Sequence, residues 1–307
     1  PSEFVKAMTQ AGFLSALIPE IYGGSGLPLR AAGVILEEIH ACGGNASATH
    51  AQMYTMGTVL RHGSEAQKNK YLPQSASGQL RLQAFGVTEP TSGTDTTKLK
   101  TRAVKDGDHY VINGQKIWTS GAQYATYGIL IARTNPDAPK HKGVSYFICP
   151  MNLPGIEIRP IREMTGGSTF NEVFFTDVRL PAVNLVGEQG EGWRLAKVTL
   201  GNERVSLSTG GVLWGSGPTA LEMLDAVRAR GVVADPIMRQ RLAGIYTEHV
   251  LLDLIRMRTL SARLRGEQPG PEASIRKILA DEHGQHVMEA ARDLLGANGM
   301  LRSTVEK

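Results

Sequence analysis

The 307-residue sequence is poor in aromatic residues and holds only two cysteines. Because aromatic side chains make up 6% of the chain, the core has to be mainly aliphatic. Cys42 and Cys149 lie far apart and form no metal-binding or redox spacing, so we expect a reducing compartment and no metal site. No apolar run is long enough to cross a membrane, and no internal repeat or low-complexity tract occurs. What is left is the composition of an ordinary globular protein.

The sequence also lacks a strong charge of one sign, since its formal net charge is +4. We attribute most of this excess to solvated surface, although it could favour an anionic ligand such as a nucleotide phosphate. No basic stripe with interleaved aromatics appears, so nucleic-acid binding is not expected. The chain begins at Pro1 without an initiator Met or signal peptide and ends abruptly at Lys307. We expect both ends to be cut and the protein to be cytoplasmic, with the mitochondrial matrix left open.

The hydrophobic periodicity changes twice along the chain, from helical to strand-like and back to helical. It predicts an N-terminal α-helical domain (1–80), a central antiparallel β-barrel or sandwich (81–184), of which we choose the barrel, and a C-terminal helical bundle whose last helix is missing (185–307). The fold class is therefore a multidomain α+β fold.

The individual elements follow from the same patterns. Apolar spacing predicts helices near residues 4–14, 34–39, 53–61 and 64–78 of the first part. Residues 104–111 are typical of a hairpin with Asp106-Gly107 as its turn. Further strands are expected at residues 116–119, 128–132, 144–149, 156–161 and 172–178. One long helix is predicted over residues 193–230, and two more over 237–264 and 272–295.

Two segments carry the strongest functional signal. The run Val87-Thr88-Glu89-Pro90-Thr91-Ser92-Gly93-Thr94-Asp95 gathers hydroxyls, a glycine and backbone donors at the end of an apolar strand. The run Ile112-Asn113-Gly114-Gln115-Lys116-Ile117-Trp118-Thr119-Ser120-Gly121 ends in a large aromatic, two hydroxyls and a glycine. Backbone N–H groups and hydroxyls suit anionic oxygens, while Trp offers a flat face and one N–H. Together they predict a site for a flat, polar-edged ring with a phosphate tail.

These two segments resemble the flavin site of the acyl-CoA dehydrogenase family. The resemblance extends from Ile18-Pro19-Glu20 to Leu295-Gly296-Ala297-Asn298-Gly299. It implies an acyl-CoA dehydrogenase-like fold, an FAD cofactor and a role in fatty acid and lipid metabolism. Hydrogen bonds to the ring would raise its electron affinity. The resemblance places the flavin contacts at Phe85, Val87, Thr88, Gly93, Thr94, Trp118, Thr119 and Ser120.

Family enzymes also take flavin contacts from a neighbouring subunit, so the resemblance implies a homodimer or homotetramer. The matching cofactor-binding positions are Arg228, Gly296, Ala297 and Gly299, with Arg230 an equally good candidate for the arginine. Two departures stand here: Gly231-Val232 replaces the family's Phe-Gly, and Ala297 replaces its second glycine. The resemblance further implies an electron-transfer flavoprotein as the electron acceptor.

Dehydrogenation of an acyl-CoA thioester to the trans-2-enoyl-CoA requires a base for the α-proton, while a hydride passes to flavin N5. Similarity to the isovaleryl- and long-chain-type enzymes places this base at Glu203, directly before Arg204. Burial by flavin and substrate would raise the pKa of Glu203. The other interpretation is an ion pair within or between helices. Thr94, Leu200 and Arg204 are the expected substrate-binding residues, and the acyl chain stays undefined.

Two rival functions remain open: a flavin oxidase or monooxygenase on the same scaffold, and a non-catalytic subunit of a heteromeric acyl-CoA dehydrogenase. Slow reoxidation of the reduced flavin by air would favour the dehydrogenase. Glu282, His283 and His286 lie close together on one predicted helix, but no further ligand is evident. We expect them to be solvated or to hydrogen-bond between helices.

Overall fold

The computed structural model describes residues 2–207, 219–231, 235–265 and 272–300. It divides into two compact units, Pro1–Asn202 and Glu203–Lys307, and each is described by itself. Within the described ranges, no helix is both long and apolar enough to cross a membrane.

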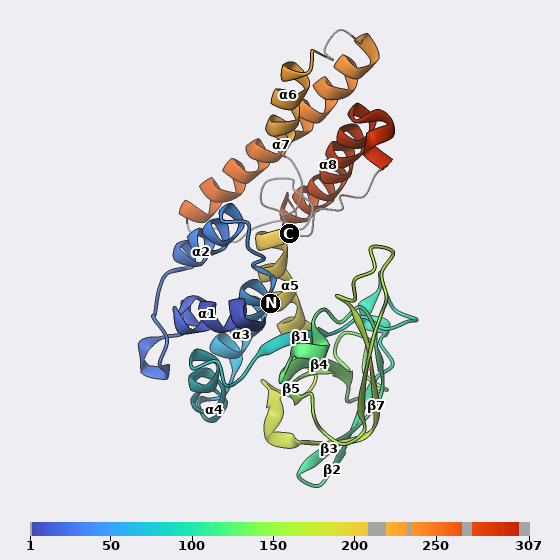
Figure 1. Cartoon of the computed structure of the whole chain (residues 1–307). Helices are drawn as coiled ribbons and strands as arrows, with labels where there is room; N and C mark the ends of the chain where they lie inside the picture. Colours follow the sequence, from blue (N-terminus) through green and yellow to red (C-terminus); the bar gives the residue numbers. More distant parts are fainter. Residues whose placement is uncertain (1, 208–218, 232–234, 266–271, 301–307) are drawn as a thin grey trace. The chain divides into compact units, whose positions relative to one another are not determined.

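The first unit begins with four helices (Figure 1), which pack through small apolar clusters. Their bounds are α1 Ser2–Gln10, α2 Leu29–Ala41, α3 Ser47–His62 and α4 Glu65–Ala76. The sequence marks the start of α4, because the Ser64 side chain accepts a hydrogen bond from the Gln67 N–H and the Gln67 side chain accepts one from the Ser64 N–H. The predicted helices of the first part are thus confirmed, with shifted ends.

A mixed eight-stranded sheet follows. Its strands are β1 Leu82–Gly86, β2 Arg102–Asp106, β3 His109–Lys116, β4 Tyr127–Arg133, β5 Val144–Pro150, β6 Ile156–Pro160, β7 Asn171–Pro181 and β8 Leu185–Val186. The strand order is β6-β7-β3-β2-β4-β5-β8, with β1 beside β4. Buried side chains of α3, α4, β1, β4 and β5 share one core, which fixes the helices against the sheet.

The three-part helix–sheet–helix class is confirmed, but the sheet is mixed rather than purely antiparallel, and its closure into a barrel is not confirmed. Strand β4 pairs in parallel with both β1 and β2, and the strand order does not close. A tight turn enforces antiparallel pairing only between the strands it joins, as Gly107-Asp108 does for β2 and β3, one residue later than predicted. A long stretch of chain separates β1 from β4, so their relative direction is free.

Two element predictions were wrong. The expected strand at residues 116–119 is absent, because β3 ends at Lys116 and Trp118 has a left-handed backbone with φ of 59°. The single helix over residues 193–230 is interrupted: α5 spans Gly192–Leu207, and α6 begins separately at Ala220. The Thr219 side chain caps α6 by accepting a hydrogen bond from the Glu222 N–H, which starts a new helix there.

In the second unit, α6 (Ala220–Ala229), α7 (Pro236–Leu264) and α8 (Glu272–Leu294) share an apolar core, and a short 3₁₀ helix at Gly296–Met300 follows (Figure 1). Pro236 occupies the first position of α7, where the missing N–H donor of proline costs no helical hydrogen bond. The helices predicted at 237–264 and 272–295 are confirmed to within a residue at each end.

Candidate active site

The first predicted flavin segment is the loop that leaves β1. Phe85 is half-buried against the core and Val87 is buried, whereas Pro90 and Thr91 are exposed and Ser92 is buried again. Gly93 and Thr94 are exposed, and no atom lies within 4 Å of the position a Cβ would take at Gly93. The loop therefore presents an open backbone at its tip and an anchored backbone at its base.

The second segment runs from the end of β3 into a turn. The Ile117 N–H donates to the Thr88 carbonyl at 2.9 Å, which joins the two predicted flavin segments directly. Trp118 remains 55% exposed and packs edge-on against Phe170, with ring centroids 6.0 Å apart. Ser120 is exposed. The structure thus brings the two predicted segments together just after the C-terminal ends of β1 and β3.

Asn171 at the start of β7 holds the turn after Trp118. Its carbonyl accepts from the Thr119 N–H at 3.0 Å, and its side-chain amide donates to the Thr119 carbonyl at 3.0 Å. The amide also donates to the Gln123 side chain. Asn171 is fully buried, so these hydrogen bonds hold the backbone of Thr119 against the interior of the protein.

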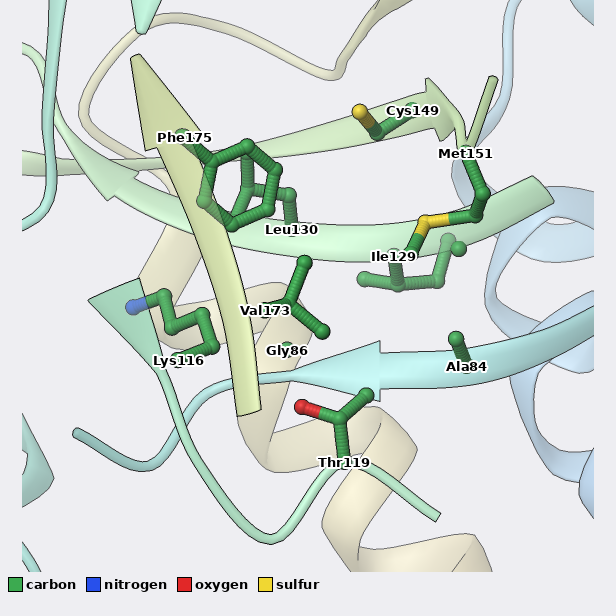
Figure 2. A pocket seen from close by; sticks show the side chains of 11 residues that line it. Ala84, Gly86, Lys116, Thr119, Ile129, Leu130, Cys149, Met151, Val173 and Phe175 are labelled. Atoms are coloured by element: carbon green, nitrogen blue, oxygen red, sulfur yellow. The ribbon is translucent and has the colours of Figure 1, made fainter. Parts of the chain in front are cut away.

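Two buried hydroxyls of these segments lack a protein partner within the described part of the chain: Ser92 Oγ and Thr119 Oγ1. Thr119 lines a small cavity together with Gly86, Lys116 and Val173 (Figure 2). A buried hydroxyl without a partner carries a desolvation penalty that a ligand or water relieves. Both hydroxyls are thus available to a bound group.

The sequence analysis missed a buried ion pair that joins the two segments, between Glu89 of the first and Lys116 of the second. Lys116 Nζ contacts Glu89 Oε1 at 2.8 Å and donates to the Val87 carbonyl at 3.1 Å. The exposed fractions of the two side chains are 0% and 4%. Glu89 also accepts from the Lys100 and Thr101 N–H groups, at 2.6 and 2.9 Å.

The protonation of this pair follows from burial and proximity. Burial by itself raises the pKa of Glu89, but the Lys116 charge and the Lys100 N–H bring that pKa below its ordinary value. Burial lowers the pKa of Lys116 to about 8, although the Glu89 carboxylate acts in the opposite direction. Glu89 is therefore a carboxylate at neutral pH and Lys116 is predominantly charged.

The predicted base lies on α5, whose first half the structure describes in detail. Thr199 is fully buried: its hydroxyl oxygen lies 2.7 Å from the Thr58 hydroxyl oxygen and 3.0 Å from that of Tyr146, and Leu200 beside it is half-buried. Glu203 and Arg204 continue the helix, but their side chains lie outside the described residues. Their roles stay predictions.

The residues expected to reach a neighbouring subunit lie in the second unit. Arg228 is exposed and pairs with Asp225, one turn earlier on α6, at 3.0 Å. Gly296 has a left-handed backbone, and Ala297 is exposed. A Cβ at Gly299 would stand 2.3 Å from the Arg292 carbonyl oxygen, so only glycine fits that turn. Their contact with a cofactor stays a prediction.

The histidines of α8 make hydrogen bonds between helices. His283 and His286 place Nδ1 at 3.0 and 2.9 Å from the carboxylate of Glu248 on α7. No group of side chains in the described residues has the arrangement of a metal site.

Three family models match successive parts of the chain. They describe the acyl-CoA dehydrogenase N-terminal domain over residues 1–79, the middle domain over 84–178 and the C-terminal domain over 190–306. The chain belongs to the acyl-CoA dehydrogenase family.

Individual relatives agree with this assignment. Acyl-CoA dehydrogenase FadE26 of Mycobacterium tuberculosis is 32% identical over 98% of this chain and 76% of its own length. FadE34 of the same organism is 38% identical over 80% of this chain, which spans only 34% of that relative. A solved structure, described as the Tcur3481-Tcur3483 steroid ACAD, superposes with a TM-score of 0.85 at 34% identity, covering 99% of this chain and 78% of the other.

Members of this family are FAD flavoproteins, and the residues present fit that group. The unpartnered hydroxyls of Ser92 and Thr119 supply hydrogen-bonding groups, the exposed Trp118 supplies a flat face, and the tip at Gly93 leaves room for a close backbone approach. The two segments chosen from the resemblance thus lie side by side in the structure. The pairing of Glu89 with Lys116 could be recognised only from the structure, because it depends on their shared burial.

Proposed function

We propose that this chain is an FAD-dependent acyl-CoA dehydrogenase that oxidises an acyl-CoA thioester to the trans-2-enoyl-CoA. The observation that supports this most is the joining of the two flavin segments through Ile117 and Thr88 in a chain whose three parts match the family. The bound FAD would supply the two-electron acceptor.

The chain's own residues would bind, orient and deprotonate. Thr88, Thr119 and Ser120 would donate hydrogen bonds to the cofactor, and Trp118 would cover part of it. Glu203 would take the α-proton of the thioester, whose low acidity requires a positioned carboxylate. Thr94, Leu200 and Arg204 would line the substrate side, and Arg228 with Gly296, Ala297 and Gly299 would reach the cofactor of a neighbouring subunit.

The direct test is an anaerobic titration of the FAD-loaded full chain with a panel of acyl-CoA thioesters. The panel should include straight-chain, glutaryl, cyclic and steroid thioesters, because relatives carry the last three in their names. Bleaching of the visible flavin band identifies a substrate. No bleaching with any thioester, or rapid reoxidation of the reduced protein by air, would contradict the proposal and favour a non-catalytic subunit or an oxidase, respectively.

The assignment of the base is tested by Glu203→Gln. We expect the rate of flavin reduction to fall by about 100-fold or more, since a positioned base contributes on that order. Glu191→Gln is a matched control, because Glu191 lies directly before the same helix and pairs with Arg194 at 3.1 Å. A normal rate of bleaching in Glu203→Gln would exclude it as the base.

The partners are also proposals. We propose an electron-transfer flavoprotein as the acceptor and a homodimer or homotetramer as the assembly, in the cytoplasm. A structure of a ChsE4-ChsE5 complex from Mycobacterium tuberculosis, 31% identical to this chain, shows that heteromers occur among relatives. Light scattering of the FAD-loaded protein, alone and with a coexpressed relative, distinguishes the two assemblies.

A further inference from the structure

The feature that carries a further inference is the Lys116–Glu89 ion pair, whose members stand directly beside the proposed cofactor contacts. Thr88 comes one residue before Glu89, and Trp118 comes two residues after Lys116. The Lys116 ammonium reaches across to the Val87 carbonyl as well as to the carboxylate. One buried cation therefore contacts the first segment at two points while its own backbone is part of the second.

Glu89 extends the same connection to the rest of the sheet. Its second oxygen accepts from the Lys100 N–H and its first from the Thr101 N–H, just before β2. Arg133, the other cation near Lys116, supports this stretch by donating to the Leu99 and Thr97 carbonyls at 3.1 and 2.7 Å. The carboxylate thus fixes the base of the cofactor loop relative to a third piece of backbone.

Burial makes this arrangement stiff. Neither charge reaches water, so any movement of one segment away from the other would leave an unpaired charge inside the protein. Separating the charges of an exposed ion pair costs much less, because water solvates each of them. Arg179 and Asp106 of the same sheet are such a pair: they lie 2.9 Å apart, but their side chains are 57% and 59% exposed.

We propose that Lys116 and Glu89 are positioning residues that set the spacing between the two FAD-binding segments, and that this spacing governs FAD affinity and the environment of the flavin ring. The proposal rests on the proposed function. The pair itself touches no reacting atom; it acts through Val87, Thr88 and the backbone that leads to Trp118.

The test uses apo full-length chain titrated with FAD, and compares Lys116→Met, Glu89→Gln and the double variant. Each single variant leaves one buried charge unpaired and should lower both thermal stability and FAD affinity. The double variant removes both charges, so its stability should largely recover. Its FAD dissociation constant should stay raised by about tenfold, because the Val87 carbonyl still lacks its donor.

A purely structural pair predicts a different pattern, in which FAD affinity and the visible flavin spectrum recover together with stability in the double variant. That result, or FAD binding within twofold of wild type in Lys116→Met, would overturn the proposal. Arg179→Met is the matched control and should change neither quantity. If the wild-type chain itself takes up no FAD, the proposed function fails and this inference fails with it.

Discussion

Replacing Thr199 with valine tests how α5 is fixed in the first unit. The Thr199 hydroxyl lies between the hydroxyls of Thr58 on α3 and Tyr146 on β5, at 2.7 and 3.0 Å, and also donates to the Leu195 carbonyl at 3.3 Å. All three hydroxyl-bearing side chains are fully buried. Valine keeps the shape of threonine, so the change removes hydrogen bonds and almost no volume.

The size of the effect follows from what is left behind. Two hydroxyls lose a common partner, but those of Thr58 and Tyr146 lie close enough to interact with each other. When they bond to each other, one hydroxyl donates and the other accepts, so the accepting hydroxyl's own O–H loses its acceptor, at about 1–3 kcal/mol. For a unit of 202 residues, this corresponds to a fall in Tm of roughly 2–12 °C.

The assay is urea unfolding of the full chain followed by tryptophan fluorescence, in a Trp214→Phe background, since the other two tryptophans, Trp118 and Trp193, lie in the first unit. Thr9→Val is the control, because half-buried Thr9 donates a hydrogen bond to the Val5 carbonyl within α1, most of which is exposed. The triple variant Thr58→Val, Tyr146→Phe and Thr199→Val should cost less than the sum of its single changes, because no orphaned hydroxyl remains. A Thr199→Val protein within 0.5 kcal/mol of wild type, or additive single changes, would refute this reasoning.

Two further perturbations have clear signs. In Gly192→Ala, a Cβ would stand 2.5 Å from the Ser145 backbone, which cannot give way, so we expect a loss of about 1–3 kcal/mol by thermal denaturation; Gly244→Ala, with open space at its Cβ, should be neutral or stabilising. Burial, with a smaller effect from His40, lowers the pKa of His50 from 6.5 to about 4. Below pH 6.5 the unfolded chain binds a proton on His50, whereas the folded chain binds it only near pH 4. The free energy of unfolding therefore falls as the pH is lowered from 6.5 towards 4. His50→Gln should flatten that fall, and an NMR titration of His50 near pH 6.5 in the folded protein would contradict the reasoning.

The helices illustrate which predictions local patterns can carry. Apolar periodicity, with Pro236, Gly266 and Pro271 marking the ends, located α7 and α8 to within a residue. The break before α6 was missed, although Thr219-Ala220-Leu221-Glu222 has the spacing of a capping box. A helix start inside a helical stretch changes no periodicity, but the capping pattern and the preceding Gly215-Ser216-Gly217-Pro218 run could both have located it.

The sheet illustrates where local patterns fail. Strand positions follow from short apolar runs, but the pairing of β1 with β4 depends on contacts more than 40 residues apart in sequence. The end of β3 was also missed, because nothing in Lys116-Ile117-Trp118-Thr119 marks the left-handed backbone at Trp118. A tryptophan with positive φ is uncommon, and it is held here by tertiary contacts to Phe170 and Asn171 rather than by its own preference.

The candidate site combines both situations. Residues that would touch the cofactor, such as Thr88 and Trp118, lie within two short segments and could be found from sequence resemblance. The residues beneath them could not, because Glu89 and Lys116 each have the sequence appearance of an ordinary surface charge. Only the fold shows that they are buried together, 27 positions apart, and that Glu89 also binds backbone before β2. The strength of an ion pair depends on how little water reaches it, so its importance to the site is a property of the packed sheet and not of either residue.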